Sequence, residues 1–258
     1  MKIFKRLFNN PLRVLIYFIY NFILFFNIKK KIYYSNYLKE KSFFISFDCD
    51  TQKDIDYLEE LLSKLNTIEI KILLAIPAEL IEKNLVLFQK LIKNYEIEFL
   101  NHGYFIHTEF MEREKNYVST LSYNKKDIEF IKKDILLAHN FFEKKLNIIL
   151  KGFRAPHFGE INLKLKSKIY KFISELGYIY SSSSIYDLAI LKGSIFKLHN
   201  ITDLTVTGRT ENITRMLDSW SFLENKNNKV ILNKAYIEEL EKVKKIFLEK
   251  NYNFLNIY

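Results

Sequence analysis

The sequence predicts an α/β fold in which strands and helices alternate, built as a deformed (β/α) barrel. First, short apolar runs of strand length alternate with segments of helical periodicity from Ser42 onward. Second, most of these runs are apolar throughout, which is typical of parallel strands buried on both faces. Third, reactive side chains follow directly after several runs, where folds of this kind place their sites. The number of repeated units favours a barrel over an open sheet.

The elements follow one another in a regular order along the chain. The first predicted strand is FFISF, residues 43–47, and the helix after it covers 53–65. The second strand, 70–76, is stopped by Pro77 because proline lacks the N–H that a strand ladder needs. Further strands are expected at 96–100, 148–153, 178–183, 194–198, 203–207 and 253–258, and helices at 78–94, 125–146, 162–177 and 233–251.

Composition restricts the class of protein. The chain has 258 residues, of which 48% are apolar, enough to bury a large core. A single cysteine, Cys49, excludes an intramolecular disulfide. The net charge is +10, but the basic residues form no clustered stripe or nucleic-acid-binding motif, so no nucleic-acid partner is expected.

The segment 1–41 differs from the rest of the chain. Between Val14 and Ile28 only Asn21 and Asn27 are strongly polar, and basic residues flank the run. The run is shorter than the ~20 residues of a usual membrane span. Two interpretations stay open: a hydrophobic helix that associates with a membrane surface, or one that packs on the main domain or a partner. Membrane association, with a cytoplasmic location as the alternative, is therefore expected of the chain, and residues 42–258 form its main domain.

Two carboxylates follow the first predicted strand, and they need a counter-charge. Asp48 and Asp50 are separated only by Cys49, and like charges this close oppose each other's ionisation. Alternation along a strand places both carboxylates on one face and Cys49 on the other. Other strand ends carry further reactive residues: His102 and His107, then Arg154 and His157, and later Asp218 and Trp220.

A carboxylate and two imidazoles form a normal ligand set for Zn²⁺ or a similar divalent ion, with a position left open for water. Such an ion would also relieve the repulsion between the two aspartates. One carboxylate would bind the cation, and the other would act as a base for the bound water.

Four motifs, SFDCD, NHGYFIH, GFRAPHFG and LDSW, occur in the order and at about the spacing found in polysaccharide deacetylases. Over residues 42–258 the chain resembles this family, the NodB-homology carbohydrate esterases (family 4). The resemblance implies a deformed (β/α) barrel of the NodB-homology type. It also implies metal-dependent removal of N-acetyl groups from an amino-sugar-containing polysaccharide or glycolipid, with Zn²⁺ as the expected ion.

The resemblance also implies roles for individual residues. Asp50, His102 and His107 would bind the metal. Asp48 would be the catalytic base, and Arg154 would hold it ionised and oriented.

The resemblance implies that other residues bind the oxyanion of the intermediate or line the substrate groove. The backbone N–H near His157 would help to bind the oxyanion. Asp218, Trp220 and Tyr104 would line the groove for an N-acetylated or lipid-linked glycan.

The chain departs from the family pattern at three places. His102 and His107 are five residues apart instead of four, which on a regular helix is ~140° out of register. His157 stands where the family usually has tyrosine. No histidine follows the last predicted strand, which ends at Tyr258. Either the general acid is supplied elsewhere, with His199 and His157 as the candidates, or the chain is truncated, or catalysis is weak or absent.

These departures keep two other functions open. One is a catalytically impaired relative that binds glycan in the same groove. The other is a different metal-dependent hydrolase that cleaves another C–N bond on the same barrel.

Overall fold

The computed structural model describes residues 40–68, 71–157, 161–185, 188, 192–210, 215–227, 229–249 and 254–258, and four single residues nearer the N-terminus. The expected hydrophobic helix within 1–41 lies almost wholly outside the described residues, as do Phe158 and Gly159 of the third motif. Within the part that is described, no helix is both long and apolar enough to cross a membrane.

An eight-stranded sheet forms the centre of the molecule and confirms the predicted α/β fold with parallel strands. Its strands, in spatial order, are β12 (Phe254–Ile257), β1 (Ser42–Asp48), β2 (Ile72–Ile76), β3 (Ile97–Asn101), β6 (Gly152–Phe153), β7 (Tyr180–Ser181), β9 (Ile201–Leu204) and β8 (Ile195–Leu198). All neighbours pair in parallel except β8 and β9, which form an antiparallel hairpin. The expectation of parallel pairing is therefore wrong for β8.

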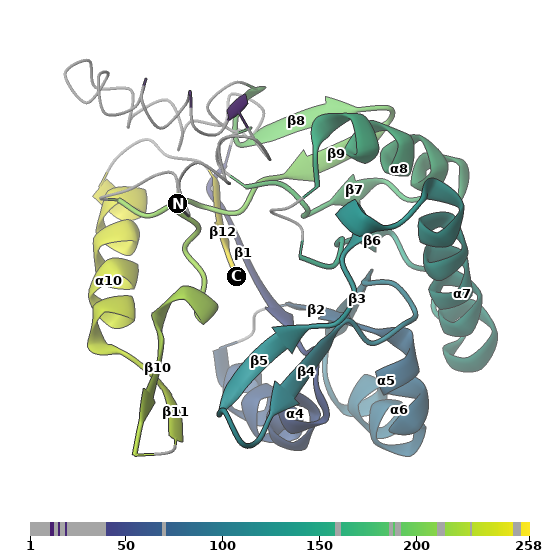
Figure 1. Ribbon diagram of the computed structural model, residues 1–258. Helices are drawn as coiled ribbons and strands as arrows, with labels where there is room; N and C mark the ends of the chain where they lie inside the picture. Colours follow the sequence, from purple (N-terminus) through teal and green to yellow (C-terminus); the bar gives the residue numbers. More distant parts are fainter. Residues whose placement is uncertain are drawn as a thin grey trace.

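Helices surround the outside of the sheet (Figure 1). They are α4 (Gln52–Leu65), α5 (Ala78–Lys83), α6 (Leu85–Asn94), α7 (Ile128–Leu146), α8 (Leu163–Glu175) and α10 (Lys234–Glu249). Each described residue of β2 is buried, because β1 and β3 flank this strand and helices cover it. The continuous apolar run ILLAI is the sequence signature of that position.

The sheet curves so that its first strand approaches its seventh. The backbone N–H of Thr207, just beyond β9, donates to the carbonyl of Asn256 on β12 at 2.9 Å. The Asn256 side-chain amide donates to the carbonyls of Leu204 and Thr205 at 3.1 and 3.3 Å. These bonds bring the carboxyl ends of β12 and β9 together, although β1, β2, β3, β6 and β7 lie between them in the order of the sheet.

A glycine in the short strand β6 allows a side-chain contact between the two strands that flank it, β3 and β7. The Tyr180 ring on β7 lies over Gly152, where an added Cβ would collide with the ring. The Tyr180 hydroxyl thereby reaches Glu98 on β3 and donates to it at 2.6 Å. Gly152 is required at this position because the ring occupies the space of its missing side chain.

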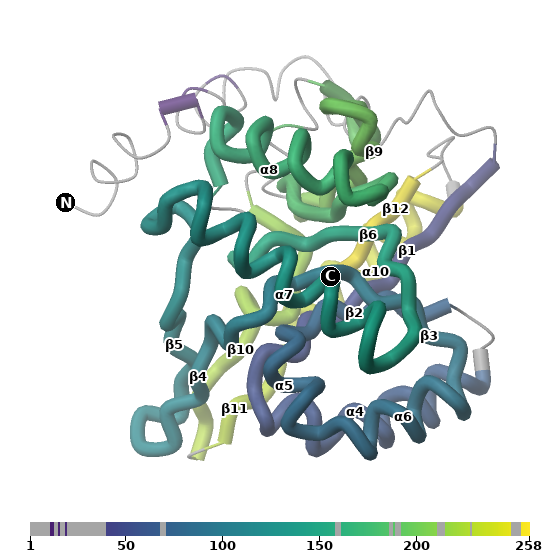
Figure 2. Tube along the Cα trace, turned by 90° about the vertical axis from the view of Figure 1, so that its right-hand side faces the viewer, coloured from purple at the N-terminus to yellow at the C-terminus, as the bar shows by residue number. Residues whose placement is uncertain are grey.

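Two hairpins had no counterpart in the sequence-based assignment. They are β4 (Thr108–Met111) with β5 (Asn116–Ser119), and β10 (Leu223–Lys226) with β11 (Lys229–Leu232). Figure 2 shows both hairpins on the same side of the molecule. Each strand has only four residues and is largely exposed, so neither carries the continuous apolar signal of the central strands.

Candidate metal centre and active site

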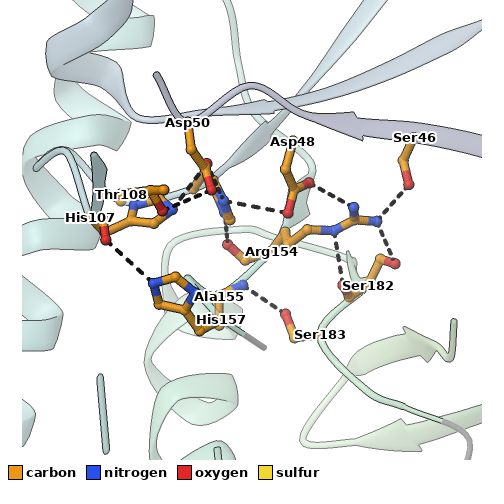
Figure 3. Close-up of polar contacts among 12 residues, drawn as sticks. Ser46, Asp48, Asp50, His107, Thr108, Arg154, Ala155, His157, Ser182 and Ser183 are labelled. Carbon is orange, nitrogen blue, oxygen red and sulfur yellow. Dashed lines mark hydrogen bonds and ion pairs between the residues drawn. The ribbon is translucent and has the colours of Figure 1, made fainter. Parts of the chain in front are cut away.

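The predicted site residues converge at the carboxyl ends of β1, β3 and β6. Asp48 is the last residue of β1, His102 follows β3 directly, and Arg154 follows β6. Because these strands are parallel, their carboxyl ends lie at one edge of the sheet. Figure 3 shows Asp50 directed toward His107, and Asp48 directed toward Arg154.

Asp50, His102 and His107 form a compact cluster of metal-ligating groups. Asp50 Oδ1 lies 3.3 Å from His102 Nε2 and 3.0 Å from His107 Nε2. The two imidazole rings are nearly perpendicular, with centroids 4.6 Å apart. One ligand atom from each residue lies within 4.8 Å of the others, so a single small cation can contact all three.

The cluster contains buried polar atoms without hydrogen-bond partners in the described part of the chain. Among the described residues, Asp50 Oδ1, His102 Nε2 and His107 Nε2 are buried polar atoms that satisfy no hydrogen bond, although they lie close together. Unpaired polar atoms in a protein interior are costly, and a shared divalent ion satisfies all of them. The donor set therefore fits the metal that the sequence predicted.

A second contact orients His102 toward the cluster. Its Nδ1 lies 2.7 Å from the Arg154 carbonyl oxygen, which can only accept a hydrogen bond. Nδ1 therefore donates to this carbonyl, and Nε2 faces Asp50. Burial opposes a charged imidazole, but the carboxylates of Asp48 and Asp50 outweigh it and raise the pKa of His102.

Asp50 is held from the other side by neighbouring polar groups. Its Oδ2 accepts a hydrogen bond from the Thr108 hydroxyl at 3.1 Å. Its backbone N–H donates to Asp54, which also caps the start of α4 through Thr51. Burial would raise the pKa of Asp50, but the facing histidines, His107 foremost, hold it well below its usual range.

The second carboxylate pairs with arginine. Asp48 Oδ1 lies 2.8 Å from the Arg154 guanidinium, and the exposed fractions of the two side chains are 6% and 0%. Its other oxygen is 3.6 Å from His102 Nε2. The two aspartates therefore share His102 as a neighbour, while Asp48 also pairs with Arg154 and Asp50 with His107. Cys49 between them packs in the hydrophobic core, as alternation predicted.

Serine side chains fix the position of Arg154. Its guanidinium donates to Ser46 Oγ and to both the hydroxyl and the carbonyl of Ser182. The next backbone N–H, that of Ala155, donates to Ser183 Oγ at 2.9 Å. Sequence reasoning missed these serines, although the run of four at 181–184 immediately after an apolar segment was a visible signal.

His157 lies beside the metal-ligand cluster. Its ring centroid is 5.3 Å from that of His107, and the rings are nearly perpendicular. Its Nε2 is 2.8 Å from Ser119 Oγ on β5 and 3.3 Å from the His107 carbonyl oxygen. Its φ of +47° lies in the left-handed region, which marks a sharp change of chain direction.

Asp218 and Tyr258 lie near the charged residues Asp48, Asp50 and Arg154. The Tyr258 ring lies against the Arg154 guanidinium, 5.1 Å from centroid to carbon. Burial, followed by the charges of Asp48, Asp50 and Asp218, raises the pKa of Tyr258 well above its ordinary value. Asp218 is buried, and its Oδ1 accepts the Ser221 N–H at 2.6 Å. The sequence predicts Tyr258 only as the end of the last strand, not as a neighbour of Arg154.

The predicted groove residues do not behave alike. Trp220 is half exposed, and its ring packs on Tyr117 of β5 with centroids 5.1 Å apart. Tyr117 in turn packs on Phe110 of β4 at 4.8 Å. The Tyr104 hydroxyl instead donates to Glu82 on α5 at 2.6 Å, so the described contacts do not link it to Asp48 or Asp50.

The two remaining histidines lie outside the site. His139 is in α7 and contacts the Tyr178 hydroxyl through Nδ1 at 3.2 Å. His199 forms the turn between β8 and β9, before β9 begins, and contacts Ser167 of α8. Because β9 is parallel to β7, this turn lies at the opposite edge from the cluster. His199 is therefore not placed to act as the acid.

Solved structures similar to this one support the expected resemblance at the level of the fold. A candidate polysaccharide deacetylase from Mycobacterium smegmatis aligns over 86% of this chain and 78% of its own, with 14% identity and a TM-score of 0.59. The Puue allantoinase aligns over 84% and 76%, with 10% identity and a TM-score of 0.53. No protein-family model matches the sequence, and no curated protein matches it either. At these identities the likeness extends to the fold alone.

Proposed function

We propose that residues 42–258 form a metal-dependent deacetylase domain, a deformed barrel of the NodB-homology type, that hydrolyses N-acetyl groups on an amino-sugar-containing glycan. This proposal rests on the arrangement of side chains at the carboxyl edge of the sheet. Three buried ligand atoms converge without satisfying one another, and a separate carboxylate beside them is held by a buried arginine.

The ligand set is Asp50, His102 and His107, and Zn²⁺ is the proposed ion because it favours nitrogen and carboxylate ligands with one open position. When bound, such an ion lowers the pKa of water and polarises the carbonyl of an amide. The protein's own contribution is to keep both Nε2 atoms and Asp50 Oδ1 directed at one point.

Asp48 is the proposed base. Its carboxylate stands next to the ligand cluster, is held by Arg154, and would accept a proton from water. Serines on β1 and after β7 hold Arg154 in place, so the base is oriented before substrate arrives.

His157 is the proposed source of the proton for the leaving amine. Of the five histidines, two are ligands, His139 lies in α7, and His199 is at the other edge of the sheet. His157 alone remains beside the cluster. Its backbone N–H is the proposed donor to the oxyanion, which acyl transfer requires.

A glycan is the proposed substrate because of the aromatic surface next to the site. The rings of Trp220, Tyr117 and Phe110 pack one on another, and Trp220 is half exposed. Flat apolar faces of sugar rings stack well on such side chains. The apolar run at 14–28 favours a lipid-linked or envelope glycan held near a membrane surface.

The test measures bound metal and acetate release on the full chain. Purified protein is analysed for zinc and then incubated with N-acetylated oligosaccharides, alongside Asp48→Asn and a control, Asp56→Asn, at an exposed position of α4. We expect one zinc per chain in all three proteins. Acetate release should fall ~10²- to 10⁴-fold in Asp48→Asn only, the usual contribution of a positioned base. Zinc binding without acetate release by the native chain would refute deacetylation.

Glycan binding without hydrolysis is the second candidate. It is favoured because the sequence offers one histidine, His157, for proton delivery, and Ser119 and the His107 carbonyl already engage its Nε2. In that case oligosaccharides bind to the zinc-loaded chain, but no acetate appears.

A further inference from the structure

The loop between the two histidine ligands is held by side chains rather than by helical hydrogen bonds. The N–H of Gly103 donates to Asn101 Oδ1 at 3.0 Å, and that of Ile106 donates to Glu79 Oε2 at 3.2 Å. The N–H groups of Tyr104 and Phe105 both donate to Asp134 Oδ1, at 2.7 and 2.9 Å. Every backbone N–H between His102 and His107 therefore has a side-chain oxygen as acceptor.

This arrangement resolves the spacing of the ligands. On a helix, residues five apart point ~140° away from each other and could not share an ion. Here residues 102–107 are not helical, and Gly103 adopts a φ of +77°, a conformation that favours glycine. His102 Nε2 and His107 Nε2 consequently both lie within 3.3 Å of the same Asp50 oxygen.

Asp134 is the residue that supports this loop at two backbone N–H groups. It lies on the buried face of α7 and is completely inaccessible to solvent. Its Oδ1 accepts both loop N–H groups, and its Oδ2 accepts the Tyr123 hydroxyl at 2.6 Å. A Cβ at position 103 would collide with Asp134 Oδ2, so the carboxylate packs directly on the glycine.

We propose that Asp134 is a positioning residue for the metal centre: it fixes the Gly103–Ile106 loop so that His102 and His107 face one ion, and it thereby determines how tightly that ion binds. The inference rests on the proposed function only in taking this cluster as a divalent-metal site. It does not depend on deacetylation. Glu79 supports the same loop at one N–H, whereas Asp134 supports it at two.

The experiment measures the affinity of the full chain for Zn²⁺ by competition with a chelator, and the visible absorption of the Co²⁺-loaded protein. Asp134→Ala removes the acceptor. Asp134→Glu keeps the charge but adds length where Gly103 leaves no space. Asp134→Asn keeps one oxygen for the loop, and its amide can donate to the Tyr123 hydroxyl. Glu143→Ala, at an exposed position of α7, is the matched control.

We expect Asp134→Ala and Asp134→Glu to weaken zinc binding about 10- to 100-fold, as loss of groups that orient metal ligands commonly does, and to alter the Co²⁺ spectrum. Asp134→Asn should remain within a few-fold of the native chain, and Glu143→Ala should be unchanged. Circular dichroism identifies the variants that fold. If Asp134→Ala does not fold, Asp134→Glu still tests the proposal.

The outcomes separate this inference from the proposed function. Native zinc affinity and an unchanged Co²⁺ spectrum in a folded Asp134→Ala or Asp134→Glu variant would overturn the positioning role, even if the native chain releases acetate. Loss of affinity in these variants together with no acetate release by the native chain would support the positioning role and refute deacetylation. A native chain that binds neither ion would overturn both.

Discussion

Arg154 and Asp48 form an almost fully buried ion pair, with 2.8 Å between the guanidinium nitrogen and the carboxylate oxygen. The pair joins β1 to the segment after β6, which are 106 residues apart in the sequence. A buried pair of this kind stabilises a fold less than its contact suggests, because both charges lose their hydration. Removing one partner is much more costly than removing both.

A double-mutant cycle measures this difference. Arg154→Met should lower the free energy of unfolding by ~3–5 kcal/mol, because it leaves the Asp48 charge buried without its partner. Adding Asp48→Asn to that variant should restore ~1–3 kcal/mol, since no carboxylate then remains to be compensated. Urea unfolding of the four proteins at neutral pH gives the coupling. Effects that simply add would mean that the two side chains do not stabilise each other.

Both histidines are expected to be essential for metal binding. His107 Nε2 lies closer to Asp50 Oδ1 than His102 Nε2 does, 3.0 against 3.3 Å. His107→Ala should therefore abolish the rise in melting temperature on adding Zn²⁺ as completely as His102→Ala. The native chain should gain ~2.7 kcal/mol at a hundredfold excess of free ion over the Kd. His199→Ala, at the opposite edge of the sheet, is the control. A zinc-induced rise that survives in His107→Ala would remove this residue from the ligand set.

Proton delivery by His157 predicts a specific kinetic change. His157→Gln should lower kcat for acetate release ~100-fold or more, the scale of general acid catalysis, without changing zinc content. His199→Gln should leave kcat as it is. If His157→Gln loses only a few-fold in kcat, the proton comes from another group and only the backbone at this position contributes.

The adjacency of the central site residues could be predicted, because it depends only on strand order. Asp48, His102 and Arg154 each follow a parallel strand, and the carboxyl ends of such strands meet. The same rule failed for His199. It follows the strand predicted at 194–198, but β8 is antiparallel to β9, and the turn between them lies at the other edge of the sheet.

The position of His107 could not be predicted from local spacing. The loop that carries it takes its shape from Asp134, 30 residues after Tyr104, and from Glu79, 27 residues before Ile106. Helical periodicity identifies which face of α7 is buried, but it does not tell which polar residue on that face accepts hydrogen bonds from a loop. Tertiary contacts of this kind decide the ligand geometry.

The single tryptophan makes glycan binding directly observable. Trp220 is the only tryptophan of the chain, so emission excited selectively at tryptophan, and not at the tyrosines, reports on this surface alone. N-acetylated oligosaccharides added to the slow Asp48→Asn variant should change the emission and give a saturating curve. Tyr117→Ala should weaken binding ~3- to 10-fold, because Trp220 loses the ring on which it packs.

Tyr57→Ala, at an exposed position of α4, provides the comparison for that measurement. It should leave both the emission and the binding curve unchanged. Saturable binding measured by calorimetry without any change in Trp220 emission would place the glycan elsewhere on the protein.

Glu98 gives a pH-dependent contribution to stability away from the candidate site. Partial burial would raise the pKa of Glu98, but Lys71 and the Tyr180 hydroxyl outweigh it and hold the pKa below its ordinary value. The folded state therefore binds this proton less readily than the unfolded chain, where the pKa is ~4.3. The resulting stabilisation is fully present above the unfolded pKa and is lost as the pH falls through the lower folded pKa.

Glu98→Gln should therefore cost ~1 kcal/mol of unfolding free energy at pH 7, a modest value because Lys71 is half exposed and water screens this ion pair. The difference from the native chain should shrink steadily between about pH 4.5 and pH 3, in the direction that linkage requires. Urea unfolding at several pH values measures it, with Glu96→Gln as the exposed control two residues earlier. A difference that stays constant down to pH 3 would show that the ionisation of Glu98 contributes nothing to it, and that the Tyr180 contact across Gly152 owes nothing to the charge.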